Sequence, residues 1–350
     1  MLLRKISIAK KIVLVLVLLC LTAIIWNFEL ITYGINQGIG QLKIVWNTRP
    51  VAEVLKDPSF PDSLKTKIKL VEEIRQFAFD SLGINFSKNY TTLYDQKNKP
   101  ILWVITACQP FQLKAKEWEF PFLGTVSYKG FFNIEKAKAE ENILKQQGLE
   151  TSLDEVAGWS TLGWFQDPIL SNMLKRYPGS LANLIIHELT HGTLYVKDNV
   201  DFNENLASFV GDHGAEIFLK AKYGDASSEL IKYQKRKAFY KQYSQLVLGQ
   251  SIRLNALYNS WKKEIPIKEK IKVKKVFFAN AIQELVQLYK VNQMYYPQLE
   301  KDLKKINNTF YMDEKRYREK QNYFEVEFKT KFHSNFKSYL NYLKEKYPSV

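Results

Sequence analysis

Apolar residues recur at helical spacing over residues 62–81, and this periodicity predicts an amphipathic helix. Residues 101–106 instead form a run of β-branched and aromatic side chains that is typical of a buried strand, and more strand is expected over 120–132. The helical pattern returns at 135–148 and dominates from 181 to about 347. Since no internal repeat or linker is evident, we expect one domain of the α+β class, predominantly α-helical, with a small β-sheet before its centre.

Two segments lack such a period. Glycine and proline interrupt residues 33–60, which we expect to be irregular chain with a short helix. Residues 158–168 are loop-like, although they carry Trp159, Trp164 and Phe165. Aromatic side chains in a loop just before a long helical region are candidates for lining an apolar pocket, and ordinary packing in the core is the alternative.

The N-terminus carries an apolar run over residues 12–26 that has no charged side chain, and adding the residues up to 31 gives about 20 residues, enough to cross a bilayer. Four basic residues precede it: Arg4, Lys5, Lys10 and Lys11. The positive-inside rule then predicts an N-terminal transmembrane helix with the N-terminus in the cytoplasm. The expected division is a membrane anchor over 1–31 and one domain over 32–350. A cleaved signal peptide, or a lipoprotein modified at Cys20, is the alternative.

Composition narrows the class of protein. The 350 residues include 46% hydrophobic residues, 15 glycines, 11 prolines and two cysteines, which excludes a disordered chain, a collagen-like chain and a disulfide scaffold. The formal net charge is +15. A lysine-rich surface accounts for that charge, and no zinc-finger, RNA-recognition or helix-turn-helix signature accompanies it, so we expect no nucleic-acid partner.

The sequence His187-Glu188-Leu189-Thr190-His191 carries the chemistry. Residues four apart on a helix share one face, so the two histidines can bind the same ion, and imidazole nitrogen is a good zinc ligand. Glu188 lies about 100° around the helix axis from His187, where its carboxylate can take a proton from a water molecule beside the metal. The alternative is a helix that carries two histidines and a glutamate by chance.

A catalytic zinc site needs a third protein ligand, and Glu204 is the preferred candidate. Gly192 and residues 197–199 suggest a turn after His191, and a second helix is expected from about residue 203 to 223, antiparallel to the first. Ser208, Gly211 and Ala215 follow Glu204 along one stripe of small side chains, which lets the two helices approach closely. The other possible ligands are Asp201, Asp212, His213 and Glu216.

These residues resemble the gluzincin-type zinc metallopeptidases, which have two histidines and a distal glutamate, with thermolysin and aminopeptidase N as familiar examples. The closer resemblance is to a family of predicted bacterial zinc aminopeptidases anchored at the membrane. It covers most of residues 33–325. Beyond the metal motif it rests on four segments: Gly38-Ile39-Gly40-Gln41-Leu42, Arg49-Pro50, residues 158–168 and Asn307-Asn308.

The resemblance implies a zincin-like metallopeptidase domain in which His187, His191 and Glu204 bind Zn²⁺ and Glu188 is the general base. Thermolysin-like enzymes carry an aspartate four residues after the distal glutamate, where this chain has Ser208. Support for a ligand histidine must then come from elsewhere, with Asp212 or Glu216 as candidates. The amine-recognition motif of aminopeptidase N is not found.

An aminopeptidase also needs a carboxylate for the free α-amine of its substrate. Asp167 is the preferred candidate because it lies in the aromatic loop just before the metal helix, and Asp212 and Glu216 are the alternatives. Trp159 and Trp164 are the candidate lining of the pocket for the first side chain. Four residues are candidates for stabilising the oxyanion: Tyr311, Tyr317, Tyr323 and His213.

The expected function is therefore a zinc-dependent aminopeptidase that acts on peptides, tethered as a single-pass protein to the bacterial cytoplasmic membrane with its catalytic domain outside the cytoplasm. Two alternatives remain from the sequence. One is a zinc endopeptidase with the same chemistry, and the other is a non-catalytic basic membrane-associated binding protein that has kept a metal site. The oligomeric state is not indicated.

Overall fold

A computed structural model describes residues 25–120, 124–156, 166–294, 306–318 and 321–347, together with the single positions 13, 14, 18, 22, 296, 299 and 303. The chain divides into two compact units, Met1–Asn47 and Thr48–Val350. The second unit contains the elements that the sequence assigns to the metal motif.

The first unit contains one long described helix, α2 (Phe28–Trp46). This helix corrects the expectation that the chain is irregular from residue 33. The short helix expected within residues 33–60 is α3 (Val51–Lys56), which belongs to the second unit. The glycines that suggested an irregular segment do not interrupt α2, since Gly34, Gly38 and Gly40 all avoid positive φ angles. Glycine in a helix interior costs only about 1 kcal/mol relative to alanine, which a 19-residue helix can tolerate.

The predicted N-terminal transmembrane helix is not supported, and we correct it here. Among the described residues no helix is long and apolar enough to cross a bilayer. The described helix near the N-terminus, α2, includes Glu29 and Lys43 as well as several polar amides, and such groups are costly in hydrocarbon. The prediction of a single-pass protein in the cytoplasmic membrane is corrected with it. Most of the apolar run 12–26 lies outside the described residues.

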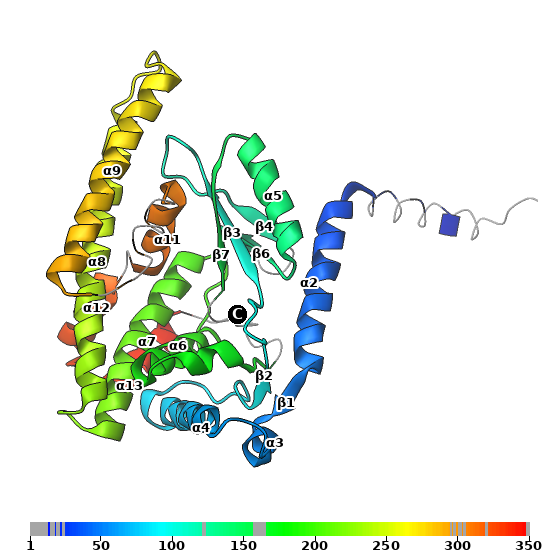
Figure 1. Ribbon diagram of the computed structural model, residues 1–350, viewed down its shortest axis with the longest axis vertical. Helices are drawn as coiled ribbons and strands as arrows, with labels where there is room; N and C mark the ends of the chain where they lie inside the picture. Colours follow the sequence, from blue (N-terminus) through cyan, green and yellow to red (C-terminus); the bar gives the residue numbers. More distant parts are fainter. Residues whose placement is uncertain are drawn as a thin grey trace, which may run out of the picture. The chain divides into compact units, whose positions relative to one another are not determined.

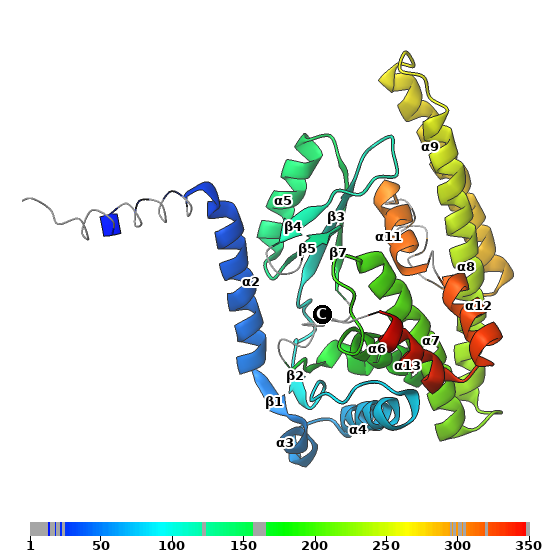
Figure 2. The same cartoon turned by 180° about the vertical axis from the view of Figure 1, so that it is seen from behind.

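The second unit is mostly helical, as expected, and the described residues contain small sheets rather than a single one. The strand predicted near 101–106 is confirmed as β3 (Trp103–Cys108), whose last four residues are buried. It pairs antiparallel with β6 (Lys129–Phe131) and β7 (Glu150–Glu155), and Figure 2 shows α5 (Ile134–Gln146) beside these strands.

The other strands form two smaller sheets. β2 (Thr92–Tyr94) lies between β1 (Thr48–Pro50), which runs antiparallel to it, and β8 (Ile169–Leu170), which runs parallel. β4 (Trp118–Phe120) and β5 (Gly124–Val126) form an antiparallel pair.

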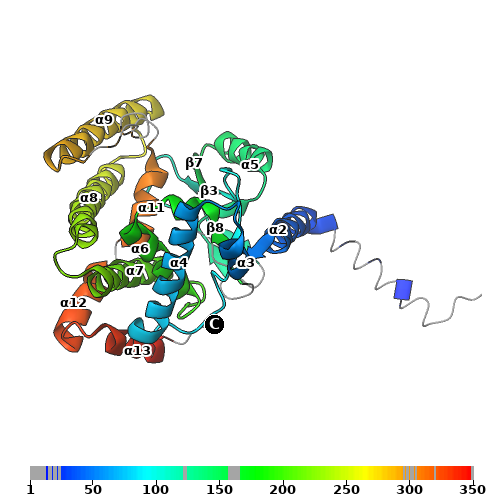
Figure 3. The ribbon, with the colours of Figure 1, turned by 60° about the horizontal axis from the view of Figure 1, so that its bottom comes forward.

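Helices make up most of the rest of the described second unit. The predicted helix 62–81 is confirmed as α4, which continues into the π-helix η1. Figure 1 shows the long helices α8 and α9 side by side at one edge of this unit, and Figure 3 shows the same pair from another direction. The bounds are α4 (Asp62–Phe77), η1 (Ala78–Leu82), the 3-10 helix η2 (Ser171–Lys175), α6 (Pro178–His191), α7 (Val200–Tyr223), α8 (Ser228–Asn259), α9 (Ile267–Val291), α11 (Asn308–Arg318), α12 (Gln321–Phe332) and α13 (Phe336–Lys346).

The pair α6 and α7 forms the centre of the second unit. Leu181, Ile185 and Ile186 on α6 are fully buried, as are Leu206 and Ala207 on α7. Close approach of the two helices depends on glycine: a Cβ added at Gly214 would lie 2.9 Å from Cγ2 of Ile186. Gly214 lies outside the stripe of small residues predicted along α7, but Gly211 of that stripe makes a similar approach, since a Cβ added there would lie 2.9 Å from the carbonyl oxygen of Asn183.

Candidate functional site

Helix α6 ends at the metal motif. Pro178 stands in its first turn, where a missing backbone N–H costs nothing, and Gly192 follows its last residue as the C-cap. The rings of His187 and His191 lie one turn apart with their centroids 5.0 Å from each other and their planes at 85°. Both imidazoles therefore project from the same face of α6, as the spacing predicted.

Helix α7 is held in register with α6 by the short loop between them. The side chain of Asn199 caps the N-terminus of α7 by accepting a hydrogen bond from the backbone N–H of Phe202 at 3.2 Å. Asn203 makes a two-way bond with the backbone of Val196, donating from Nδ2 and accepting at Oδ1, each at 2.8 Å. The residue after Asn203 is Glu204, so these bonds fix where the carboxylate emerges from the helix.

The three predicted metal ligands meet in space. Oε2 of Glu204 lies 3.4 Å from Nε2 of His187 and 3.7 Å from Nε2 of His191. One ligand atom from each of the three residues lies within 4.8 Å of the others, so the group could hold a metal ion. Donors bound tetrahedrally to zinc at about 2.0–2.1 Å lie about 3.3–3.4 Å apart, so the donor set and its spacing fit that ion.

The electrostatics of this group are those of a carboxylate held against two imidazoles. Burial would raise the pKa of Glu204, but the neighbouring His191 and His187 outweigh it and hold that pKa well below its ordinary value. Burial would lower the pKa of His191, but Glu204, Glu188 and Asp167 outweigh it and raise that pKa. The site thus concentrates negative charge around the imidazoles, which favours a bound cation.

Glu188 lies beside this group and is only partly buried. Burial raises the pKa of its carboxyl, and the negative charge of Glu204 adds to that effect, while His187 and His191 oppose it. The described side chain therefore stands within the electrostatic reach of all three candidate ligands. A carboxylate in that position can accept a proton from a molecule bound among them.

Three tyrosines lie near the site. The sequence named Tyr317 as a candidate oxyanion donor but did not name Tyr90 or Tyr128. Burial and the charge of Glu204 raise the pKa of Tyr128, and for Tyr317 the charge of Glu204 is the largest cause. Tyr90 is fully buried, and its hydroxyl has no hydrogen-bond partner among the described residues. Glu188 and Asp167 both raise the pKa of Tyr90 after burial, so its phenol faces the same group of charges.

The other predicted oxyanion donors are engaged elsewhere. The hydroxyl of Tyr311 is buried and donates to Oε1 of Gln250 at 3.3 Å. Tyr323 accepts a hydrogen bond from Lys346 at the surface, and His213 is paired with Glu325 at 2.7 Å. Tyr317 differs from these three in its link to the candidate metal site, since the charge of Glu204 is the largest cause of its raised pKa.

Asp167 is buried, with 1% of its surface exposed. It exchanges two hydrogen bonds with Asn89, both at 3.1 Å, and its carbonyl accepts from the backbone N–H of Tyr90. Its charge reaches His191, so it lies near the candidate metal site, and its role in amine binding stays a prediction. Trp159 and Trp164 lie outside the described residues.

The carboxylates expected to support a ligand histidine have other described partners. Asp212 accepts from Nδ2 of Asn183 at 2.8 Å, and Glu216 accepts from Gln234 and Lys237, also at 2.8 Å. Nδ1 of His191 is buried and has no hydrogen-bond partner among the described residues. Thermolysin-like enzymes have an aspartate where this chain has Ser208, and no carboxylate among the described residues takes over its role by accepting a hydrogen bond from this nitrogen.

Asn307 and Asn308 acquire a role that chemistry alone did not suggest. Asn308 donates to the carbonyl of Gln109 at 2.7 Å and accepts from the hydroxyl of Tyr258 at 2.8 Å, while Asn307 donates to the carbonyl of Thr151 at 2.9 Å. These bonds fasten the start of α11 to the chain around β3 and β7. They thereby place Tyr317, two turns further along α11, beside Glu204.

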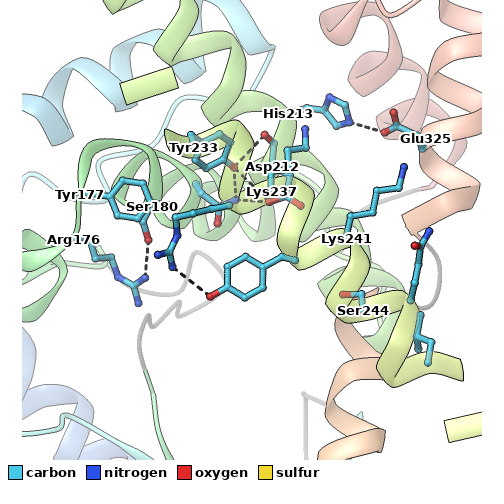
Figure 4. A pocket seen from close by; sticks show the side chains of 15 residues that line it. Arg176, Tyr177, Ser180, Asp212, His213, Tyr233, Lys237, Lys241, Ser244 and Glu325 are labelled. Atoms are coloured by element: carbon cyan, nitrogen blue, oxygen red, sulfur yellow. Dashed lines mark hydrogen bonds and ion pairs between the residues drawn. The ribbon is translucent and has the colours of Figure 1, made fainter. Parts of the chain in front are cut away.

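Two cavities are lined by residues close to the candidate site rather than by His187, Glu188, His191 or Glu204 themselves. The larger, about 1140 Å³, is lined by Ser208 and Tyr317. The smaller, about 370 Å³, is drawn in Figure 4. Arg236, Tyr240 and Ser244 line both cavities, so they are neighbours that share one wall.

A family model described as "Putative aminopeptidase" matches residues 32–346. No curated protein and no solved structure gives a significant match to the chain.

Proposed function

The chain belongs to the family of putative aminopeptidases, and from this membership we propose that it is a zinc-dependent aminopeptidase whose metal is bound by His187, His191 and Glu204. The observation that carries the proposal is the meeting of these three donors within 4.8 Å of one another, with Glu188 beside them. Family membership supports a peptidase, and the donor set supports the choice of metal.

Zinc is the metal we propose because two imidazole nitrogens and one carboxylate oxygen form a common catalytic zinc set that leaves a position open for solvent. When bound, zinc would supply Lewis-acid activation of water and of the scissile carbonyl. The sequence offered Asp201, Asp212, His213 and Glu216 as other ligands. His213 is paired with Glu325, and Glu216 with Lys237, so Glu204 is the carboxylate best placed for the role.

Glu188 is the proposed general base. Its carboxylate takes the proton of the attacking water and then delivers it to the leaving amine, so that the same group acts first as base and then as acid. Its partly buried position supports this role, because a carboxylate with a raised pKa holds a transferred proton more readily than an exposed one.

Tyr317 and Tyr128 are the proposed donors to the oxyanion of the tetrahedral intermediate. Both phenols lie within the electrostatic reach of Glu204, and Tyr317 lines the larger cavity. A phenol donates one hydrogen bond, and removing one such donor from an oxyanion site typically slows turnover by about 10²–10³-fold. Tyr317→Phe and Tyr128→Phe, assayed separately, identify which hydroxyl acts.

The free amine of the substrate requires a carboxylate, and we propose two candidates for it. Asp167 is buried near His191, and Glu314 lines the larger cavity with Tyr317. The test compares Asp167→Asn with Glu314→Gln on free and N-acetylated peptides. The carboxylate that binds the amine is the one whose loss slows hydrolysis of free peptides and leaves acetylated peptides unaffected.

The function is tested by metal analysis together with hydrolysis of amino-acid 4-nitroanilides. We expect one zinc ion per chain, and turnover that chelation abolishes and zinc restores. Glu188→Gln is expected to keep the metal and to lose turnover by at least about 10²-fold, because the glutamine cannot accept the proton. A protein that binds zinc and cleaves only N-acetylated peptides would be an endopeptidase, and one that cleaves neither would refute the proposal.

A further inference from the structure

The smaller cavity is lined by an unusual concentration of cations. Arg176, Arg236, Lys237 and Lys241 all face it, from the loop before α6 and from α8. Figure 4 shows the side chains of Arg176 and Lys241 on different sides of the cavity. Four cations around about 370 Å³ repel one another unless an anion lies between them.

The acidic groups of the same cavity have partners of their own. Glu325 accepts a hydrogen bond from His213 at 2.7 Å and pairs with Lys329 at 2.7 Å. Asp212 accepts from Asn183 at 2.8 Å. Lys237 is the one lining cation of the four with a described ion pair, to Glu216 at 2.8 Å.

Three cations therefore remain without a described acidic partner. Arg176 donates to the hydroxyl of Ser180 at 3.1 Å, and Arg236 donates to the hydroxyl of Tyr240 at 3.3 Å. Nε of Arg236 is buried and has no hydrogen-bond partner among the described residues, and Lys241 has no described ion pair. A buried guanidinium N–H left unpaired costs free energy, which a bound anion would recover.

The cavity is connected to the proposed active site through the larger cavity. It shares Arg236, Tyr240 and Ser244 with the larger cavity, whose lining includes Tyr317 and Ser208. A ligand that occupies both cavities would therefore extend to Ser208, one helical turn after Glu204 on α7, and to Tyr317, a proposed oxyanion donor.

The two cavities also differ in charge. In the larger cavity carboxylates outnumber cations, and in the smaller one cations outnumber carboxylates. The larger is lined by Glu141, Asp154, Asp313 and Glu314 with Lys145 and Arg236, and the smaller by Arg176, Arg236, Lys237 and Lys241 with Asp212 and Glu325. A peptide with a free amine at one end and a carboxylate further along is complementary to this arrangement. Its amine would lie in the larger cavity and its carboxylate in the smaller one. Guanidinium groups bind carboxylates through paired N–H donors, and a lysine adds a point charge.

We propose that the smaller cavity is a carboxylate-binding subsite in which Arg176, Arg236 and Lys241 hold an anionic group of the peptide substrate beyond the scissile bond. The carboxylate is either the C-terminus of a short peptide or an acidic side chain of a longer one. This inference rests on the proposed function, because it names the class of peptide that the proposed enzyme prefers.

The test compares Ala-Ala-Ala with its C-terminal amide in the full-length zinc-loaded protein. We expect kcat/KM to be about tenfold higher for the free acid, the effect of roughly one charge-assisted hydrogen bond. Lys241→Gln and Arg236→Gln should bring this ratio close to one by raising KM for the free acid. Lys235→Gln is the matched control, because Lys235 is an exposed lysine of the same helix that does not line the cavity.

A second pair of peptides identifies the source of the carboxylate. Ala-Glu-Ala-amide and Ala-Gln-Ala-amide differ only in a side-chain charge, so discrimination between them indicates an acidic side chain. Discrimination only between Ala-Ala-Ala and its amide indicates the C-terminus. Equal kcat/KM for both pairs in the unmutated protein, or ratios unchanged in Lys241→Gln and Arg236→Gln, would overturn the subsite.

Binding separates this inference from the proposed function. Calorimetry with Glu188→Gln gives Kd for Ala-Ala-Ala and for its amide without hydrolysis. Preferential binding of the acid by Glu188→Gln, with no hydrolysis by the unmutated protein, rejects the peptidase and keeps the subsite. Hydrolysis without preference rejects the subsite and keeps the peptidase, and absence of both binding and hydrolysis rejects both.

Discussion

Gly211 of α7 lies so close to His187 of α6 that a Cβ added to the glycine would stand 3.2 Å from the Cβ of the histidine and 2.9 Å from the carbonyl oxygen of Asn183. The distance between the two helices, and hence between His187 and Glu204, therefore depends on a residue without a side chain. The contact between α6 and α7 at Gly211 therefore helps to set the spacing of the proposed metal ligands.

Gly211→Ala is expected to push α7 away from α6. Overpacking of this kind costs about 1–3 kcal/mol of stability, and the displaced Glu204 should bind metal less tightly. Urea unfolding and competition with a zinc chelator measure the two effects. Gly249→Ala on α8 is the control, since a Cβ there meets nothing within 4 Å and should leave zinc affinity unchanged. Equal zinc affinity in Gly211→Ala would show that the glycine contact does not set the ligand spacing.

Zinc is expected to stabilise the protein through its three ligands. A ligand present at about 1,000 times its Kd adds about 4 kcal/mol to the free energy of unfolding, so zinc should raise Tm and chelation should reverse the rise. Glu204→Gln should abolish most of this shift, because it removes one anionic donor. Glu216→Gln on the same helix is the control, since Glu216 binds Gln234 and Lys237. A loss of the shift in the control alone would assign the ligand to Glu216.

Tyr90→Phe is expected to lower activity without lowering stability. The hydroxyl of Tyr90 is buried without a described partner, so its removal should leave Tm unchanged or raise it. Because the phenol lies within the electrostatic reach of Glu188 and Asp167, we expect kcat to fall by about tenfold, the size of one lost hydrogen bond in the transition state.

Tyr258→Phe is the matched control for Tyr90→Phe. The hydroxyl of Tyr258 donates to Oδ1 of Asn308 at 2.8 Å, so this variant should lose about 1 kcal/mol of stability and keep its kcat. If Tyr90→Phe behaved like the control, with lower Tm and full turnover, its hydroxyl would have a structural role only.

The Glu325 carboxylate is expected to make stability depend on acid pH. The hydrogen bond from His213, with a second from Lys329, outweighs burial and lowers the pKa of Glu325 from 4.5 to about 2. A carboxyl whose pKa is depressed by folding stabilises the protein above its unfolded pKa, and this contribution disappears as pH falls from 4.5 towards 2. Since Glu325 is partly exposed, the loss should be about 1 kcal/mol.

Urea unfolding of the metal-free protein at pH 7, 4 and 3 measures this dependence. Glu325→Gln should be less stable than the unmutated chain at pH 7, and the difference should shrink at pH 3. Glu345→Gln is the control, because Glu345 is exposed and should not change the pH profile. A constant difference between Glu325→Gln and the unmutated chain across this range would exclude the ion pair as its cause.

Local pattern predicted several elements well. Periodicity located α4 and α5, the β-branched run located β3, and the four-residue spacing of His187 and His191 placed both imidazoles on one face of α6. These features depend on residues that are neighbours along the chain. The same local reasoning was wrong for α2 and for the transmembrane helix, because it gave too much weight to glycine and to an apolar run.

Glu204 shows how far sequence can reach towards tertiary structure. A short loop and a stripe of small residues indicated that α7 would return against α6, and the structure brings the carboxylate to 3.4 Å from His187. The prediction succeeded because the two helices are adjacent in sequence, so few arrangements were possible.

The sequence by itself determined the chemistry: which side chains can hold a metal, which carboxylate stands next to them, and which helices carry them. Only the tertiary structure decided what surrounds that chemistry. Tyr90, Tyr128 and Tyr317 come from segments more than 50 residues away from the metal motif, and Arg176 and Lys241 meet across one cavity. Such contacts depend on the packing of the whole domain, so no spacing along the chain encodes them.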